Sequence, residues 1–553
     1  MQKGFRKLLI SLLAGWGVFV LVLCATPPVS RDALVHHLAV PKLYLTAVHM
    51  VELPEMPYSY FPGNLDLLYL IPLYFKVDFF AKYIHFCFAL ITAAMIYRYL
   101  KRRCSPVAGL LGALLFLSIP LITKLSTTAY VDLGLVCFSC ASLLGLFEWA
   151  EKGCRINRLL WPAVWCGLAL GTKYNGLVCW VLLTLTTCYL SKRNDLGEWR
   201  NTLYSLVRGG CFAVIALVVF SPWMIRNTLW TGNPIYPLYN SVFNPPVAAP
   251  AASNAGATPD EGPRYKVTPL NYRRDVYQES FIKIVAVPLR IFFQGEDGNM
   301  RLFDGRLTPV LLLSCCAFIR TRSSRERHEK IVLSVFSLLT ILITLFQTVF
   351  RVRYMAYALP AMTMLSVYGG FNLWRVASSA SHRWMKFTLK TIYYAFIVAG
   401  ALWSVSYAAH LYMYVDPLAY ISGAVDRDAY ISRYRFEHPA TQFINQHLPE
   451  NAVLYNILLG KRGYYLNRKY IPDVTGHTDQ IRKLIGQQGS PESLIAAFQR
   501  MGVTHWVINE RLFMKRVNAT YSEKQLRVLR AFFFTYMERL YQDRWVGVYA
   551  LSQ

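Results

Sequence analysis

The sequence predicts a polytopic α-helical membrane protein with a C-terminal α/β soluble domain. Of its 553 residues, 55% are hydrophobic and only 16% are charged, whereas a soluble chain of this length would carry more charge. Apolar runs close to membrane-spanning length recur between residues 8 and 410. Beyond residue 410 the charge rises and the apolar runs shorten. We therefore expect a multi-pass membrane domain over 1–410 and an outer α/β domain over 411–553.

About eleven helices are expected to cross the membrane, and the count could reach 13 because two neighbouring runs are short. The first run resembles a signal peptide but is too long for a typical one, so we expect an uncleaved helix. The stretch 65–76 could be an interfacial helix or an extra partial span. The expected spans are 8–25, 80–98, 106–122, 131–149, 159–171, 175–190, 207–225, 306–320, 331–350, 355–373 and 390–410.

Basic residues gather at the ends of alternate apolar runs, which predicts that these six ends face the cytoplasm. The N-terminus is then inside and the C-terminal domain outside. The net charge of +27 could indicate a nucleic-acid partner, but the placement of the basic residues accounts for it, so we expect membrane lipids and no nucleic acid. The clusters are Lys3/Arg6/Lys7, Arg98/Lys101/Arg102/Arg103, Lys152/Arg155/Arg158, Lys192/Arg193/Arg200/Arg208, Arg320/Arg322/Arg325/Arg327/Lys330 and Arg375/Arg383/Lys386/Lys390.

The same topology places a charged residue at every outer turn. A charge at a helix end costs little because its side chain can reach the interface, so each one alone means little. Two acids and several bases at one membrane face nevertheless predict a shared site. In chain order these residues are Asp32, Asp132, Lys173, Arg226, Arg351 and Arg353.

An outer pocket with an acid and several bases suits transfer from a lipid-phosphate donor. Arginine and lysine stabilise the negative charge of a departing phosphate. A carboxylate can remove the proton from an acceptor hydroxyl or amine. Polyprenyl-phosphate sugars can be presented outside a bacterial cytoplasmic membrane, whereas nucleotide sugars are not available there. The residues therefore predict sugar transfer at the outer surface.

Each of these residues also has a purely structural interpretation. Asp32 could be a favourable charge at a helix N-terminus, worth about 0.3–1 kcal/mol. Asp132 could simply begin its helix, and Lys173 could be a lysine that reaches the interface. Arg226 and Arg353 could mark the membrane boundary.

Four further residues are possible accessories to the site. His36 falls one turn after Asp32, and could orient it, contact phosphate, join a metal site or simply be packed; His37 is a weaker candidate. Arg351 could substitute for Arg353. Tyr60 could line the sugar or acceptor site, or belong to an interfacial aromatic belt.

The remaining segments are a long outer loop and the tail. The loop after Arg226 has a centre rich in Pro, Ala and Gly (244–265), followed by an amphipathic basic segment, 279–293, that suits a helix on the outer surface. In the tail, 452–458, 504–510 and 544–551 read as strands, and 490–502 and 522–540 read as helices.

Six stretches of the chain resemble the GT-C membrane glycosyltransferases, in the branch related to protein O-mannosyltransferases and the lipid A aminoarabinose transferase. The resemblance covers about residues 26 to 370 and extends more loosely into the tail. The stretches are "RDALVHHLAVPKLYL", "YSYFPGNLDLLYLIPLYF", "STTAYVDLGLVCFSCASLLGLFEWA", "GLALGTKYNGL", "PWMIRNTLWTGNPIYPLYN" and "RVRYMAYALPAMTML".

The resemblance implies a GT-C-like fold in a bacterial inner membrane and a role for each outer residue. Asp32 would be the catalytic base and Asp132 a second acid, while Lys173, Arg226 and Arg353 would bind the donor phosphate. Relatives often carry an adjacent acidic pair in the first outer loop, but here Arg31 precedes Asp32. Whether a divalent metal takes part therefore stays open, and no other cofactor is expected.

The predicted function is that of an inverting glycosyltransferase, with a polyprenyl-phosphate sugar donor and a lipid, glycan or protein acceptor. A membrane transporter or flippase for lipid-linked glycans is an alternative; it would place ionisable residues deep within helices and show two related halves. A non-catalytic envelope scaffold is a second alternative, in which Asp32→Asn would leave function intact. The sugar and the acceptor remain open.

Overall fold

The computed structural model describes residues 2–194, 199–245, 269–347, 350–473 and 476–552. Most of the Pro- and Ala-rich segment 244–265, and residues 348 and 349 of the expected span 331–350, lie outside the described residues. The chain divides into two compact units. Unit 1 comprises Met1–Cys24, Tyr60–Leu68 and Phe80–Asp416; unit 2 comprises Ala25–Ser59, Tyr69–Phe79 and Pro417–Gln553.

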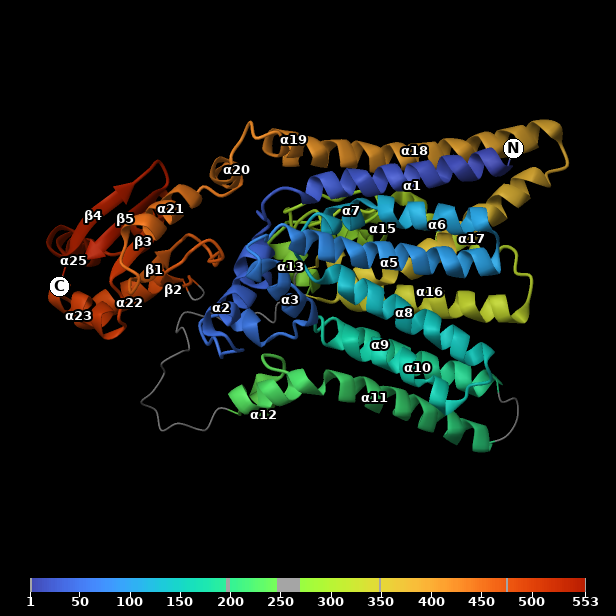
Figure 1. Ribbon diagram of the computed structural model, residues 1–553, viewed down its shortest axis with the longest axis horizontal. Helices are drawn as coiled ribbons and strands as arrows, with labels where there is room; N and C mark the ends of the chain where they lie inside the picture. The colour runs from blue at the N-terminus through green and yellow to red at the C-terminus, as the bar shows by residue number, and fades with distance from the viewer. Residues whose placement is uncertain (1, 195–198, 246–268, 348–349, 474–475, 553) are drawn as a thin grey trace. The chain divides into compact units, whose positions relative to one another are not determined.

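Unit 1 is a bundle of apolar helices whose long members run side by side (Figure 1). Within the described residues, six helices are long and apolar enough to cross a membrane, or seven if the bent pair α6–α7 forms one span. The six are α1 (Gln2–Cys24), α5 (Phe80–Arg103), α8 (Asp132–Glu151), α11 (Trp199–Thr231), α16 (Ser324–Leu345) and α18 (Arg383–Val415). The expected number of about eleven crossings stays a prediction.

The other described helical segments of unit 1 include one long helix, α17, that is largely buried. They are α3 (Asn64–Leu68), α6 (Pro106–Ser118), α7 (Pro120–Ser126), η3 (Ile156–Arg158), α9 (Leu160–Leu170), α10 (Gly176–Asn194), α12 (Asn240–Phe243), α13 (Pro269–Asp275), α14 (Phe281–Val285), α15 (Val287–Arg290), η4 (Pro309–Phe318), η5 (Val352–Ala358) and α17 (Leu359–Ser378). A Cβ at Gly369 would lie 1.8 Å from the carbonyl oxygen of Leu313. Helix α17 can therefore pack this closely on η4 only because residue 369 is a glycine.

The sequence predicts one surface helix over the amphipathic segment 279–293. The structure instead has two short helices there, α14 and α15. Pro288 lies in the first turn of α15. Proline has no N–H to continue the hydrogen bonding of a preceding helix and clashes with its last turn, so the two helices stay separate.

At one end of the bundle, arginines from two of the predicted cytoplasmic clusters form ion pairs with Glu151 and Glu329. Glu151, at the end of α8, accepts hydrogen bonds or ion pairs from Arg102, Arg103 and Arg325. Arg103 also binds Glu329 through its Nη2, at 2.6 Å. The ends of α5 and α8 and the start of α16 therefore lie together.

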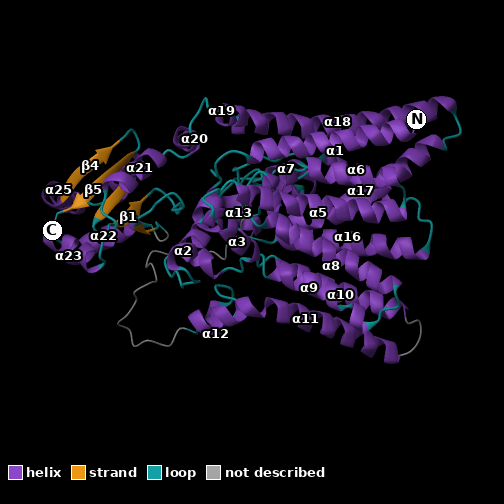
Figure 2. Cartoon of the chain, in the orientation of Figure 1, coloured by secondary structure: helices purple, strands orange, loops and turns teal. Residues whose placement is uncertain are grey.

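Unit 2 contains a five-stranded sheet of order β2-β1-β3-β5-β4, whose strands are orange in Figure 2. The strands are β1 (Val453–Ile457), β2 (Lys469–Ile471), β3 (His505–Asn509), β4 (Met537–Gln542) and β5 (Val546–Leu551). β1 is parallel to β2 and β3, whereas β5 is antiparallel to β3 and β4. One side of the sheet buries a core around Tyr455, Phe498, Trp506 and Phe532.

The helices of the tail are α19 (Pro417–Ile421), α20 (Arg427–Tyr434), α21 (His438–His447), α22 (His477–Gln488), α23 (Pro491–Arg500), α24 (Glu510–Thr520) and α25 (Glu523–Tyr536). The helix expected over 522–540 ends at Tyr536. The residues that follow form β4, because their backbone pairs with β5. Ser522 begins α25 with a capping box completed by Gln525.

Most of the chain between α1 and α5, predicted to be the first outer loop, belongs to the same compact unit as the tail. It contains η1 (Ala33–His37), α2 (Ala39–Ala47), η2 (Pro57–Tyr60) and α4 (Leu70–Tyr74). The ammonium of Lys42, on α2, donates to Tyr464 O, Leu466 O and Asn467 Oδ1, each at 2.8 Å. The carboxylate of Asp78 binds Arg427 Nη2 at 2.6 Å and accepts from Tyr464 Oη at 3.0 Å.

Candidate active site

The central contact of the site in unit 1 joins Asp132 to Lys173. Asp132 begins α8 and is buried. Lys173 lies in the turn between α9 and α10, and its Nζ donates to Asp132 Oδ1 at 2.7 Å. The lysine side chain is 18% exposed and the aspartate side chain 3%. The ammonium is therefore the part of the pair that a ligand can reach.

The turn that carries Lys173 is held in place by Asn64. The backbone N–H of Asn64 donates to Gly171 O at 2.8 Å. The indole N–H of Trp223, on α11, donates to Asn64 Oδ1 at 2.8 Å. A Cβ at Gly171 would lie 2.3 Å from Asn64 Nδ2. Asn64 therefore links the turn to α11, and the contact requires a glycine at 171.

Three cations surround the ring of Tyr354. Lys173 Nζ lies 5.2 Å from the ring centroid, and the guanidinium carbons of Arg353 and Arg351 lie 5.5 and 5.9 Å from it. Arg353 also lies over Tyr130, at 5.2 Å. The aromatic faces favour cations electrostatically and hold the three positive charges together.

The cation cluster extends through two further acids. Arg351 Nη1 lies 3.4 Å from Asp304 Oδ2. Lys124, on α7, lies 3.7 Å from Asp304 and 3.1 Å from Asp297. Tyr407 donates to Asp297 at 2.5 Å. Side chains from four distant parts of unit 1 therefore form one charged network.

Arg226 makes a second group of contacts with Tyr60. Its Nη2 donates to the carbonyl oxygen of Tyr60 at 2.7 Å and to Asn227 Oδ1 at 2.8 Å. The guanidinium lies over the rings of Trp223 and Trp230, at 4.5 and 4.8 Å. Much of its hydrogen-bonding and stacking capacity is thus used within the protein.

This second group contacts the Lys173 turn through Tyr174. Asn227 Nδ2 donates to the Tyr174 hydroxyl at 3.1 Å, and that hydroxyl donates to Tyr236 O at 2.8 Å. Burial raises the pKa of Tyr174, so the hydroxyl keeps its proton. The structure therefore brings together Asp132, Lys173, Arg351 and Arg353, with Arg226 and Tyr60 beside the same turn.

The other predicted site residues lie in unit 2. Asp32 is the N-cap of the π-helical segment Ala33–His37, and within the described chain its side chain makes no capping hydrogen bond to that segment. The rings of His36 and His37 are 3.9 Å apart, and His36 stacks on Tyr58 at 4.9 Å. Short π-helical turns are frequent at functional sites.

The tail holds this π-helical segment through its backbone. The N–H groups of Gly463 and Tyr464 both donate to Leu34 O at 3.2 Å. The Tyr465 hydroxyl donates to Pro28 O at 2.7 Å. The position of the first predicted acid is therefore fixed by the tail as well as by its own loop.

The described residues contain no group of three or more His, Cys, Asp or Glu side chains that could hold a metal ion. We therefore derive no step through a metal.

Several residues of the site were not singled out from the sequence. Their signals are visible in hindsight: each lies within two residues of a predicted cation or acid, or in the "FPGN" turn. They are Asn64, Tyr130, Tyr174, Asn227 and Tyr354. Lys124, on α7, had no such signal, because only folding brings it near Asp304.

Comparison with known proteins bears on the fold. Residues 68–225 match the family model of dolichyl-phosphate-mannose-protein mannosyltransferase. Comparison with curated proteins gives no match. The crystal structure of apo ArnT from Cupriavidus metallidurans is similar at 15% identity, with a TM-score of 0.57, over 99% of this chain and 98% of that one.

Two further structures have related folds. ArnT from the same organism bound to undecaprenyl phosphate matches at 14% identity and a TM-score of 0.56, over 100% of this chain and 98% of that one. The apo oligosaccharyltransferase of Archaeoglobus fulgidus matches at 12% identity and a TM-score of 0.51, over 99% of this chain and 74% of that one. Together with the family model, these matches confirm the resemblance to the GT-C superfamily of membrane glycosyltransferases related to ArnT and the protein mannosyltransferases.

Proposed function

We propose that the chain is an inverting glycosyltransferase that moves a sugar from a polyprenyl-phosphate donor to an acceptor at the outer face of a bacterial cytoplasmic membrane. The observation that carries the proposal is the cluster of Lys173, Arg351 and Arg353 around Tyr354 beside Asp132. A cluster of three cations suits a phosphate. ArnT, whose fold is similar, binds undecaprenyl phosphate.

In this mechanism the cations act on the leaving group. Lys173 and Arg353 hold the donor phosphate and stabilise its charge as the bond between the anomeric carbon and the phosphate oxygen breaks. Asp132 positions the Lys173 ammonium, to which it is bonded at 2.7 Å. Arg351 is a third cation for the phosphate. Arg226 keeps the neighbouring turn in place through Tyr60.

Asp32 is proposed as the general base. It accepts the proton of the acceptor hydroxyl or amine while that group attacks the anomeric carbon, and the lipid phosphate leaves from the opposite side. His36, packed between His37 and Tyr58, is proposed to orient the segment that carries Asp32. The orientation with the N-terminus inside and residues 411–553 outside belongs to the same proposal.

Donor binding tests the role of the cations. We expect native mass spectrometry of the purified full chain to show undecaprenyl phosphate bound to the wild type. We expect Lys173→Met with Arg353→Met to lose about tenfold or more in affinity, since hydrogen bonds to charged groups contribute about 1.5–3 kcal/mol each. Lys152→Met, at the other end of α8, is the control and should bind as wild type does. Equal binding by all three proteins would contradict the phosphate site.

Product analysis tests the role of Asp32. Envelope lipids, glycans and proteins from cells with and without the chain should differ by one saccharide, measured by mass spectrometry. We expect Asp32→Asn to abolish that product while undecaprenyl phosphate still binds. Glu55→Gln, an exposed acid of the same loop, should make the product normally. Undiminished product from Asp32→Asn would exclude it as the base.

A further inference from the structure

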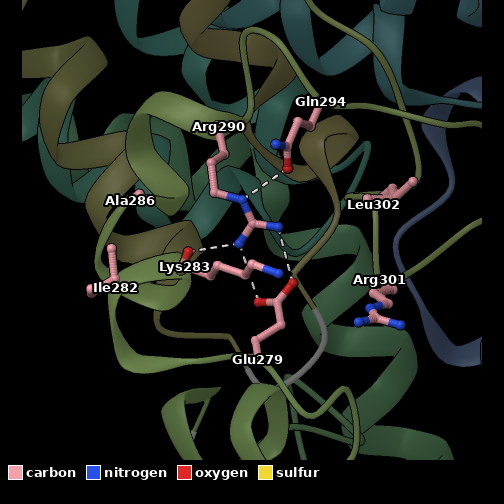
Figure 3. Close-up of a pocket in the computed structure, with 8 residues that line it drawn as sticks. All are labelled: Glu279, Ile282, Lys283, Ala286, Arg290, Gln294, Arg301 and Leu302. Carbon is pink, nitrogen blue, oxygen red and sulfur yellow. Dashed lines mark hydrogen bonds and ion pairs between the residues drawn. The ribbon is translucent and has the colours of Figure 1, made fainter.

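A pocket of about 640 Å³ lies in the outer loop between α11 and η4 (Figure 3). None of its lining residues belongs to the cluster around Tyr354, and none has a part in the proposed transfer. The residues are Glu279, Ile282, Lys283, Ala286, Arg290, Gln294, Arg301 and Leu302. The pocket therefore requires an explanation of its own.

One wall of the pocket is a rigid ion-pair network around Glu279. This buried carboxylate accepts from Arg273 Nε at 2.7 Å and from Arg290 Nη2 at 3.0 Å. Arg290 also donates to Gln294 Oε1 at 2.9 Å and to Lys283 O at 2.6 Å. The guanidinium of Arg290 thus makes most of its hydrogen bonds inside the protein, and these bonds hold the wall together.

Two other cations line the pocket, Lys283 and Arg301, and they give it a net positive charge. Lys283 and Arg301 are exposed. In Figure 3 they lie on different segments, with Lys283 next to Glu279 and Arg301 farther to the right. With Arg290, the lining holds three positive charges against the one negative charge of Glu279. The surface of the pocket is therefore set up for an anion.

Large apolar side chains are exposed on α14 and α15 and just after α15. This is unusual for a surface in water, but suits a segment that lies in the headgroup region of a membrane. The exposed fractions are 77% for Phe281, 79% for Ile282, 60% for Val285, 56% for Leu289 and 47% for Phe293. Cations beside exposed apolar groups match a ligand with a phosphate and acyl chains.

We propose that this pocket binds the phosphate headgroup of an anionic phospholipid. Lys283 and Arg301 bind the phosphate, the Glu279–Arg290 network keeps the wall rigid, and the acyl chains lie over the exposed side chains of Phe281 and Ile282. The proposal does not rest on the glycosyltransferase activity, because it uses none of the residues assigned to it.

The test measures lipid binding to the full chain, purified in detergent and freed of lipid. Native mass spectrometry should show phosphatidylglycerol bound more tightly than phosphatidylcholine. We expect the double variant Lys283→Glu and Arg301→Glu to lose phosphatidylglycerol affinity by about fivefold or more for each charge removed. The matched control, Lys515→Glu with Arg530→Glu on exposed positions of the tail, should bind as wild type does.

Three results would overturn the proposal: equal affinity of the wild type for the two lipids, unchanged phosphatidylglycerol binding in the pocket variant, or an equal loss in the control. A rise in melting temperature with inorganic phosphate equal to that with phosphatidylglycerol would also overturn it, in favour of a site for a free anion. The milder pair Lys283→Gln and Arg301→Gln separates binding from folding. It should melt as wild type does in phosphatidylcholine, yet lose the extra stabilisation by phosphatidylglycerol.

Discussion

At the scale of single residues, the ammonium of Lys173 is held by an acid on one side and an aromatic ring on another. Asp132 lies at 2.7 Å and the Tyr354 centroid at 5.2 Å. Since the carboxylate is almost completely enclosed, it depends on the lysine to balance its charge. This dependence has a measurable consequence for stability as well as for phosphate binding.

Removing one member of this pair should cost more than removing both. We expect Lys173→Met to lower the free energy of unfolding by about 3 kcal/mol, because it leaves the buried Asp132 carboxylate unpaired. The double variant with Asp132→Asn should recover at least half of that loss. Chemical unfolding in detergent, analysed as a double-mutant cycle, measures the coupling. Additive losses would show that the pair is not coupled in stability.

At the scale of elements, helix α2 is joined to the tail by one lysine. Burial lowers the pKa of Lys42 to about 8, yet its ammonium protons are donated to three oxygens of residues 464–467. A methionine at this position would keep the apolar stem and leave those oxygens without their donor.

We therefore expect Lys42→Met to destabilise unit 2 by about 2 kcal/mol, since hydrogen bonds to charged groups contribute about 1.5–3 kcal/mol each and two of the three are partly buried. Limited proteolysis of the full chain should then cut the segment 459–468 faster than in the wild type. Lys469→Met, at an exposed position of β2, is the control and should be cut at the wild-type rate. Identical cleavage of both variants would show that Lys42 does not hold the two elements together.

The loop before α14 should depend on acidity through Glu279. Burial alone raises the pKa of Glu279, but hydrogen bonds from Arg273 and then Arg290 outweigh it and lower the pKa to about 2, from an ordinary 4.5. Between these values the unfolded loop binds more protons than the folded one. The stabilisation is thus complete above about pH 4.5 and is lost as the pH falls toward 2.

Hydrogen exchange of residues 277–294 measures this effect. Protection should be constant from pH 7 to 5, after correction for the intrinsic exchange rate, and should fall between pH 4 and 2. In Glu279→Gln the protection should be lower at pH 7 and no longer depend on pH over the acidic range. A wild-type profile that is flat down to pH 2 would contradict the ion-pair network.

At the scale of the whole chain, unit 1 has charged networks at both ends of its helices. Twenty-residue α8 begins at Asp132 and ends at Glu151, which separates the two networks by roughly 30 Å at 1.5 Å per residue. One network surrounds the candidate site, while the other joins Glu151, Arg103 and Glu329. The length matches the apolar thickness of a bilayer.

The second network should matter for stability and not for chemistry. The Glu329 side chain is 6% exposed and binds Arg103 at 2.6 Å. Glu329→Ala would leave the Arg103 guanidinium without this partner, so it should lower the free energy of unfolding by about 3 kcal/mol or more. Undecaprenyl phosphate binding by the folded fraction should remain that of the wild type. Thermal unfolding and native mass spectrometry measure the two effects, and a specific loss of donor binding would contradict the separation of roles.

The local features of the fold could be predicted because they depend on neighbours in the sequence. The expected spans 8–25, 80–98 and 131–149 coincide with long helices to within one or two residues at their starts or ends: α1, α5 and α8. Elements whose limits depend on distant partners were predicted wrongly or not at all. The end of α25 at Tyr536 is decided by pairing of β4 with β5, and β2 has only three residues, too few for a periodic signal.

The candidate site was predictable only in kind. Charged residues at successive outer turns predict that some of them meet. Lys173 does bind Asp132, and it shares the Tyr354 ring with Arg353. The sequence does not indicate that the guanidinium of Arg226 donates to the carbonyl oxygen of Tyr60 and stacks on two tryptophans. The roles of Asp32, His36 and His37 stay predictions, to be tested as described above.

The sequence by itself determined the membrane character of the chain, the positions of its apolar helices and the alternation of basic ends, because hydrophobicity and helical periodicity are local properties. Only the tertiary structure decided which charges contact one another, that Asp132 pairs with Lys173, and that the segment between α1 and α5 packs with the tail through Lys42 and Asp78. These contacts join residues far apart in the chain, and packing of whole helices and strands selects them from many pairings that the sequence would equally allow.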